Sequence, residues 1–157
     1  MNLFEWLHSN ITKESTVLDI GCGNKEYSNS LNCKRVITID AWKKVKPDIL
    51  IDLEVRDIPF TENSFDVILL LDFIEHLDKE RGKEIIEQAR TIANKILLLT
   101  PLWWQDNAVN VENPELWCYG NKYDYHKSLW TLEDFSGWNR ATNIQNTDNY
   151  FIGTYEN

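Results

Sequence analysis

The fold of this chain is decided by the stretch Thr16-Val17-Leu18-Asp19-Ile20-Gly21-Cys22-Gly23-Asn24. Its apolar half is typical of a strand buried in a parallel sheet. Gly21 and Gly23 allow a sharp turn and a close approach to a ligand, because neither residue carries a Cβ. A second apolar run, 35–39, ends at Asp40, where a carboxylate can accept both hydrogen bonds of a ribose diol. The pattern favours a nucleotide-type cofactor cradle; the alternative is a tight turn beside a solvated aspartate.

The class of cofactor is indicated by the residue three positions after the second glycine. A dinucleotide-binding turn has a third glycine there, which leaves room for a pyrophosphate at the helix N-terminus. This chain has Glu26 instead, whose negative charge opposes a pyrophosphate. A ligand without phosphates is therefore favoured, and a dinucleotide-dependent oxidoreductase is the weaker interpretation.

Residues 17–23 resemble motif I of the class I S-adenosylmethionine-dependent methyltransferases. Further stretches resemble the family's motifs in the same order along the chain: Asp52–Phe60 with its Ile58-Pro59-Phe60 turn, Asn63–Ile68, Glu75-His76-Leu77, and Thr100-Pro101 after 96–99. The last match is similar to the branch related to ubiquinone and menaquinone biosynthesis enzymes (methyltransferase type 11). Together these motifs cover residues 16–101.

The resemblance implies an α/β fold: a Rossmann-like doubly wound sheet, mostly parallel with an antiparallel C-terminal strand, in the order 3-2-1-4-5-7-6. Alternation of apolar strands and amphipathic helices along the chain is consistent with it. We expect one domain spanning residues 1–157. The expected elements are strands at 16–20, 35–39, 48–51, 65–71 and 95–100, a helix at 79–94, a short helix opened by Thr131, and a hairpin of 141–146 with 150–155.

The link between the second and third strands, Ala41–Pro47, is too short for the usual crossover helix. Seven extended residues reach about 23 Å, enough to return along a strand about 16 Å long. We therefore expect an extended return that leaves one sheet face thinly covered. Trp42 is interpreted as a plug for that gap, with a place beside the adenine as the alternative.

The family resemblance also implies a cofactor, S-adenosylmethionine, with S-adenosylhomocysteine as its product. It assigns the loop of Gly21, Cys22 and Gly23 to the methionine part, with Asp19 orienting that loop, or the amino group as well. The remaining expected contacts are Asp40 and Ala41 at the ribose, Asp52 and Leu53 at the adenine, and Asp72 at the methionine end. Solvated loop carboxylates are the alternative for Asp52 and Asp72, while Asp66 is expected to be structural.

The sequence indicates fewer residues for binding the methyl acceptor and for catalysis. His126 is the candidate general base for a hydroxyl acceptor, because its ordinary pKa lies near neutrality; a structural role is the alternative. Adjacent Glu75 and His76 point to different sides of a helix and make a poor chelate, so a packing role and no metal are expected. The segment 102–138 is rich in Trp and Tyr, which suits an acceptor or a protein partner, or a core around Phe135.

Composition narrows the function classes. The formal charge of −9, from 16 basic and 25 acidic residues, opposes nucleic acid and anionic membranes as partners. The three cysteines are odd in number and lack zinc-type spacing, which favours reduced thiols and a cytoplasmic location. The N-terminal residues 1–8 predict a short amphipathic helix rather than a signal peptide or membrane span. We expect a small-molecule methyltransferase, with a catalytically silent interaction module as the alternative.

Overall fold

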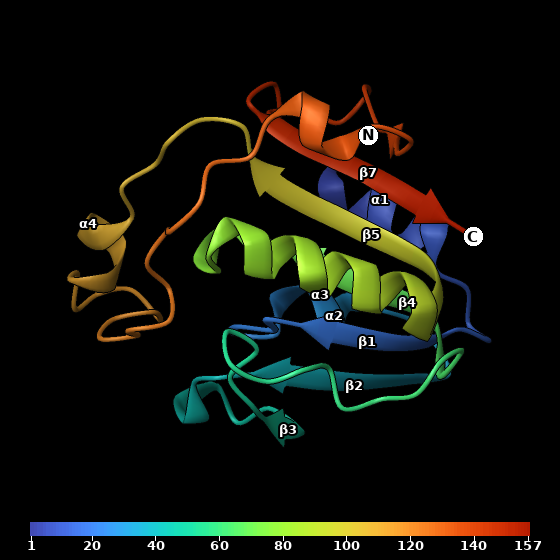
Figure 1. Cartoon of the computed structure of the whole chain (residues 1–157), viewed down its shortest axis with the longest axis horizontal. Helices are drawn as coiled ribbons and strands as arrows, with labels where there is room; N and C mark the ends of the chain where they lie inside the picture. Colours follow the sequence, from blue (N-terminus) through green and yellow to red (C-terminus); the bar gives the residue numbers. More distant parts are fainter.

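The computed structural model describes all residues, 1–157, and has one seven-stranded sheet at its centre (Figure 1). The strands are β1 (Thr16–Ile20), β2 (Arg35–Asp40), β3 (Ile49–Leu50), β4 (Phe65–Leu71), β5 (Ala93–Pro101), β6 (Asn139–Arg140) and β7 (Tyr150–Glu156). Their order across the sheet is β3-β2-β1-β4-β5-β7-β6. All pairs are parallel except β5 with β7 and β6 with β7. The predicted fold class and strand order are confirmed.

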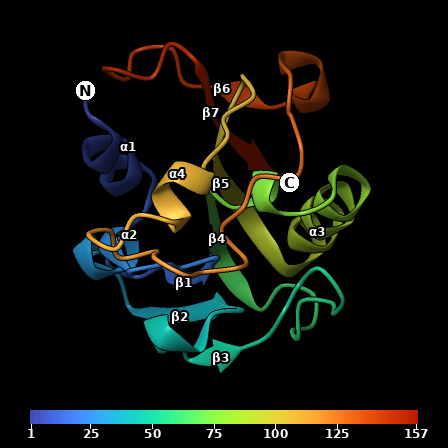
Figure 2. The same cartoon turned by 90° about the vertical axis from the view of Figure 1, so that its left-hand side faces the viewer.

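Helices cover both faces of the sheet, as Figure 2 shows with α1 and α2 on one side and α3 on the other. The α-helices are α1 (Leu3–Asn10), α2 (Glu26–Ser30), α3 (Lys79–Ile92) and α4 (Ala108–Val111). Three short 3-10 helices are η1 (Lys43–Val45), η2 (Ile74–His76) and η3 (Leu132–Phe135). The N-terminal helix predicted from residues 1–8 packs Trp6 and Leu7 against the sheet. No helix has the length and apolar character needed to cross a lipid bilayer.

Helix α3 covers the face of the sheet opposite α1 and buries Ile85, Ile86, Ala89 and Ile92 there, as the spacing of these residues predicts. It ends two residues earlier than expected. The chain passes directly from Ile92 into β5, whose first residue, Ala93, pairs with Phe65 of β4. From Ala93 onward the chain therefore pairs with β4 as strand β5, and the helix does not continue.

The predicted C-terminal hairpin is correct in its second strand and wrong in its first. Strand β6 is Asn139–Arg140, whereas residues 141–146 lie outside any strand. After Ala141 N donates to the carbonyl of Ile152, the chain leaves the sheet edge. Ile144 then packs into the cluster on the α1 face, so burial of its side chain replaces further pairing.

The link from β2 to β3 also differs from the extended return that was expected, since residues 43–45 form the 3-10 turn η1. The interpretation of Trp42 as a plug is wrong: its side chain packs against neither apolar cluster. Its ring lies 6.4 Å from that of Trp117, with the Lys44 ammonium 5.0 Å from its centroid. The groups recorded beside the Trp42 ring, Lys44 and Trp117, are themselves outside both apolar clusters.

The aromatic side chains near the C-terminus form part of the core, as one interpretation of the sequence held. Trp130, Phe135, Trp138 and Phe151 are buried together, with the Phe135 and Phe151 rings stacked at 3.9 Å. A capping box between Thr131 and Asp134 begins the predicted short helix, which is the 3-10 helix η3. Asp66 is structural as expected, because it accepts hydrogen bonds from the backbone and hydroxyl of Thr16 at the strand's amino end.

The chain between β5 and the buried Ser128 forms a long excursion that carries α4 (Figure 1). Residues 102–128, here named the capping segment, extend past the carboxyl ends of the central strands (Figures 1 and 2). Those strand ends are where open α/β sheets bind ligands. The capping segment therefore lies beside the predicted cofactor cradle.

Candidate functional site

A cavity of about 440 Å³ lies between the carboxyl ends of the strands and the capping segment. Its volume falls within the roughly 300–1,000 Å³ typical of small-molecule sites. Of the nine residues predicted to bind the cofactor, all except Asp19 line it: Gly21, Cys22, Gly23, Asp40, Ala41, Asp52, Leu53 and Asp72. His126 lines the same cavity. Residues predicted from separate motifs thus meet around one space.

The glycine loop after β1 is held by backbone hydrogen bonds: Gly21 N and Cys22 N both donate to the carbonyl of Ile39 in β2, at 2.9 and 3.1 Å. Gly21 and Gly23 have φ of +71° and +49°, conformations that glycine adopts without strain. A Cβ on Gly21 would collide with the Phe73 ring. The need for glycine there comes from φ and from Phe73, and not from an open space for a ligand.

The carboxylate of Asp40 ties the end of β2 to the glycine loop. Its Oδ2 accepts a hydrogen bond from Gly23 N at 3.0 Å, and its Oδ1 accepts one from Trp42 N at 2.8 Å. A carboxylate has about four lone-pair positions, so each oxygen retains acceptor capacity toward the cavity. Burial raises the pKa of Asp40 against the effect of these amides.

Asp19 lies in β1 behind the glycine loop and does not line the cavity. Its side chain is 2% exposed, and its Oδ2 has no hydrogen-bond partner. Burial raises the pKa of Asp19 to about 6; Asp40 adds to that rise, while Ser28 and Lys25 oppose it. A buried carboxylate oxygen without a donor is costly, and an ammonium group reaching the loop would supply one.

The other two carboxylates predicted to bind the cofactor, Asp52 and Asp72, have different hydrogen-bond partners. Asp52 Oδ1 accepts a hydrogen bond from Glu54 N at 3.0 Å, and the Leu53 carbonyl accepts one from Arg81 at 2.7 Å. Asp72 has a φ of +49°, and the Tyr27 hydroxyl donates to its Oδ2 at 3.5 Å. Burial raises the pKa of Asp72 to about 7, and the charge of Asp124 adds to this.

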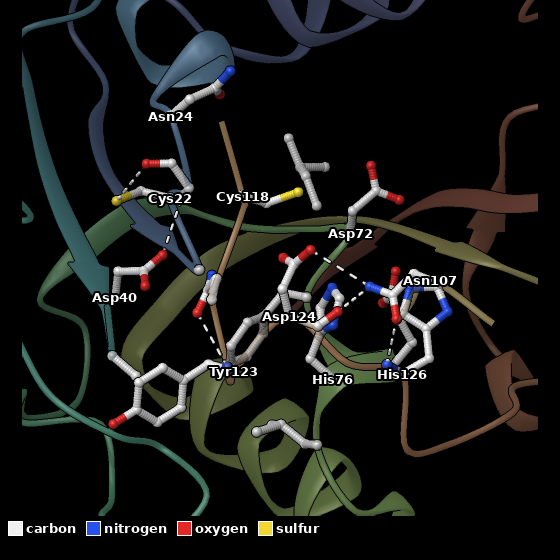
Figure 3. Close-up of a pocket in the computed structure, with 18 of the residues that line it drawn as sticks. Cys22, Asn24, Asp40, Asp72, His76, Asn107, Cys118, Tyr123, Asp124 and His126 are labelled. Carbon is white, nitrogen blue, oxygen red and sulfur yellow. Dashed lines mark hydrogen bonds between the residues drawn. The ribbon is translucent and has the colours of Figure 1, made fainter. Parts of the chain in front are cut away.

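His76 and His126 lie together at the other end of the cavity (Figure 3). Glu75 also lines the cavity and lies beside them. The two imidazole rings meet edge to face, with centroids 4.9 Å apart. Burial, followed by the neighbouring His126, lowers the pKa of His76 to about 4, and burial also lowers the pKa of His126. Burial and the charge of Asp72 raise the pKa of Glu75 well above its usual value.

Three residues of the capping segment were not predicted as site residues from the sequence: Asn107, Trp117 and Asp124. The Asn107 side chain accepts a hydrogen bond from His126 N at 2.9 Å and donates to the carbonyl of Asp124. Trp117 lies over the glycine loop, with its Cη2 2.9 Å from where a Cβ on Gly23 would stand. These residues are far from motif I in sequence and carry no spacing pattern, so only tertiary structure identifies them.

The lining of the cavity is acidic. Seven carboxylates line it: Glu26, Asp40, Asp52, Glu54, Asp72, Glu75 and Asp124. The one lysine that does so, Lys127, is paired with Glu54 at 3.1 Å. Such a lining opposes a pyrophosphate and suits a cation. The site therefore fits a sulfonium-bearing cofactor better than a dinucleotide.

Comparisons with known proteins agree with this geometry. The family model described as a methyltransferase domain (Methyltransf_11) matches residues 18–95. No curated protein sequence matches the chain. A protein of Bacillus halodurans C-125 described as a methyltransferase aligns with a TM-score of 0.63 at 16% identity, over 88% of this chain and 68% of its own.

Two archaeal structures have the same fold. An S-adenosylmethionine-dependent methyltransferase of Methanosarcina mazei aligns with a TM-score of 0.65 at 15% identity, over 98% of this chain and 96% of its own. A structure of a Haloferax volcanii complex, between a methyltransferase and the Trm112 methyltransferase activator, also aligns. Its TM-score is 0.60 at 14% identity, over 92% of this chain and 83% of its own. With its motif order, its sheet and its family match, the chain belongs to the class I S-adenosylmethionine-dependent methyltransferases, and its cofactor is S-adenosylmethionine.

Proposed function

We propose that this chain transfers the methyl group of S-adenosylmethionine to a small acceptor that enters beneath the capping segment. The observation that carries the proposal is the single acidic cavity joining the glycine loop and Asp40 to the histidine pair. One end offers a cradle for the cofactor, and the other offers polar groups for an acceptor. When bound, the cofactor supplies an electrophilic methyl group on a positively charged sulfur.

Each predicted cofactor residue is assigned a role in this proposal. The free acceptor capacity of Asp40 suits the ribose hydroxyls, next to Ala41. Asp52 and Leu53 border the adenine side. The glycine loop with Cys22 borders the methionine part, whose ammonium would be attracted by the charge of Asp19, buried behind that loop. Asp72, buried beside Tyr27, borders the same end.

The protein's contribution to the reaction is mainly to position two reactants and exclude water. Trp117 lies over the glycine loop and shields the donor side. On the acceptor side, the lowered pKa of His126 keeps its ring neutral at pH 7. A neutral imidazole can accept the proton of a hydroxyl acceptor, so His126 is our candidate general base.

The chemistry of the lining also limits the acceptor. Seven carboxylates face the cavity, which favours an uncharged or cationic molecule over one that carries a phosphate or a free carboxylate. The chain's net charge of −9 opposes nucleic acid as the acceptor in the same way. We place the protein in a reducing compartment such as the cytoplasm, because its cysteines are odd in number.

A protein partner is a second candidate role for the aromatic segment 102–138. Large apolar side chains remain exposed there, with Trp104 at 55% and Trp117 at 46%. The Haloferax volcanii methyltransferase with this fold occurs in complex with an activator protein. If the chain is catalytically silent, this surface is where it would act as an interaction module.

The test is calorimetric titration of the purified protein with S-adenosylhomocysteine and, separately, with NAD. We expect one-to-one binding of the first and none of the second. Asp40→Ala should abolish most of the affinity, whereas Asp148→Ala, at an exposed aspartate that does not line the cavity, should not change it. Unchanged affinity in folded Asp40→Ala would refute the ribose assignment. Turnover of labelled S-adenosylmethionine against a metabolite panel then separates an enzyme from a silent binding module.

A further inference from the structure

Three potential metal ligands from distant parts of the chain meet at the acceptor end of the cavity. Glu75 and His76 belong to η2, and His126 belongs to the capping segment fifty residues later. Their ligand atoms all lie within 4.8 Å of one another. We propose that Glu75, His76 and His126 form a binding site for one divalent transition-metal ion.

The expectation that Glu75 and His76 make a poor chelate considered only the adjacent pair. It did not include a third ligand, and it assumed a regular helix. In the structure the pair sits in a three-residue 3-10 turn, and His126 approaches the His76 ring edge to face. The two rings and the carboxylate thus converge on one point.

The spacing of the three ligand atoms suits a metal after small adjustments. Atoms about 2.1 Å from a common ion in tetrahedral arrangement are about 3.4 Å apart. Separations of up to 4.8 Å therefore require ligand movements of about 1 Å.

The groups around the three residues hold them as ligands are held in known metal sites. His76 Nδ1 lies 3.4 Å from the carbonyl of Tyr125. A hydrogen bond there leaves Nε2 as the lone-pair nitrogen, the usual arrangement for a ligating histidine. The Thr100 hydroxyl donates to Glu75 Oε2 at 3.0 Å and orients the carboxylate.

The backbone also fixes η2 against the capping segment. The Glu75 carbonyl accepts hydrogen bonds from Lys127 N at 2.8 Å and Ser128 N at 3.1 Å. Asn107, which is buried, accepts one from His126 N at 2.9 Å. The two pieces of chain that supply the ligands are therefore joined immediately beside those ligands (Figure 3).

The site is open on one side, because all three residues line the cavity. Three protein ligands with an open position are characteristic of metal sites that bind an exchangeable ligand. Two imidazoles with one carboxylate favour ions such as Zn²⁺, Fe²⁺ or Co²⁺ over Mg²⁺ or Ca²⁺. The exchangeable ligand class is an oxygen of the acceptor, a hydroxyl or a carbonyl.

This role excludes the general-base role of His126, because a nitrogen bound to a metal has no lone pair for a proton. The two assignments can be separated without turnover. Metal binding requires no S-adenosylmethionine, so it is tested on the protein alone.

The experiment is titration of the full chain with Co²⁺, followed by visible absorption and calorimetry. Wild type should bind one equivalent, with d–d bands and no thiolate charge-transfer band. The second condition matters because Cys22 and Cys118 also line the cavity. Absence of saturable one-to-one binding, or a spectrum dominated by thiolate ligation, would overturn the proposal.

Variants identify the ligands. His76→Ala, His126→Ala and the volume-conserving Glu75→Gln should each weaken Co²⁺ binding by at least ~10-fold. His8→Ala is the matched control, since His8 is exposed on α1 and is the only other histidine. Equal affinity in wild type and the folded His126→Ala protein, or loss of affinity in His8→Ala, would contradict the assignment.

A wild-type measurement avoids the question of whether the variants fold. In long-range ¹H–¹⁵N spectra, one equivalent of Zn²⁺ should shift the ring nitrogens of two histidines and leave His8 unchanged. Titration with S-adenosylhomocysteine in the presence of a chelator keeps the two proposals apart. Asp40→Ala should lose the cofactor and retain Co²⁺, while His126→Ala should do the reverse.

Discussion

Replacement of Asp19 by asparagine tests the cofactor cradle through its electrostatics. The carboxylate is 2% exposed, its Oδ2 has no partner, and its pKa is raised from 3.8 to about 6. That difference is equivalent to about 3 kcal/mol of unfolding free energy lost when Asp19 ionises in the free protein. Asp19→Asn keeps the shape of the side chain and removes the charge.

The sign of the pH dependence follows from the direction of the pKa change. Between pH 3.8 and 6 the folded protein holds a proton on Asp19 that the unfolded chain has released, so rising pH lowers stability. The full loss of unfolding free energy from ionising Asp19 is present above pH 6 and absent below pH 3.8. The amide has no such dependence, so the stability of Asp19→Asn relative to wild type should rise by about 2 to 3 kcal/mol between pH 4 and pH 8.

Thermal unfolding of the cofactor-free proteins at several pH values measures this difference. For a chain of this size, 3 kcal/mol corresponds to roughly 6–12 °C in Tm. Only the change with pH is diagnostic, because the asparagine amide adds a pH-independent cost of its own: its buried N–H groups require hydrogen-bond partners. S-adenosylhomocysteine should bind the variant more weakly, since the negative charge behind the glycine loop, which attracts its ammonium, is gone. A stability difference that does not vary with pH, together with unchanged ligand affinity, would refute this reasoning.

Three further perturbations have definite expected results. Gly23→Ala should displace Trp117, change tryptophan fluorescence and weaken cofactor binding. Gly137→Ala is the control, because Gly137 also has a positive φ but nothing lies within 4 Å of the added Cβ. The control should show only a loss of about 1 kcal/mol in unfolding free energy. Sinefungin, whose amine replaces the sulfonium, should bind more tightly than S-adenosylhomocysteine at low salt, and the difference should shrink as salt rises; calorimetry that finds no salt-dependent preference would contradict the acidic-cavity argument. Trp130→Ala should cost about 3–5 kcal/mol in urea unfolding, because Trp130 is 1% exposed, while Trp104→Ala at an exposed position should change stability by less than about 0.5 kcal/mol.

The central strands were predictable because their apolar runs are continuous. β1, β4 and most of β5 are buried on both faces, and such strands show their ends clearly in sequence. The carboxyl ends of parallel strands meet at one edge, so residues after β1, β2 and β4 were placed together without tertiary information. Strand β6 was missed because its two residues are exposed and form no apolar pattern.

Apart from His126, the residues of the acceptor side could not be predicted, for a different physical reason. Its residues come from η2 and from the capping segment, which are far apart in sequence and show no shared period. Their approach depends on hydrogen bonds such as those from Lys127 N and Ser128 N to the Glu75 carbonyl, which leave no trace in residue type. Trp42 was likewise misplaced, because its packing partner, Trp117, is brought near only by the fold.

The central claim is that the cavity at the strand ends binds S-adenosylmethionine, and a crystal structure of the chain with S-adenosylhomocysteine tests it most directly. The account predicts ribose oxygens within hydrogen-bond distance of Asp40, the amino group near Asp19, and the sulfur facing the end that holds His76 and His126. Ligand density outside this cavity, or a ribose that makes no contact with Asp40, would contradict it.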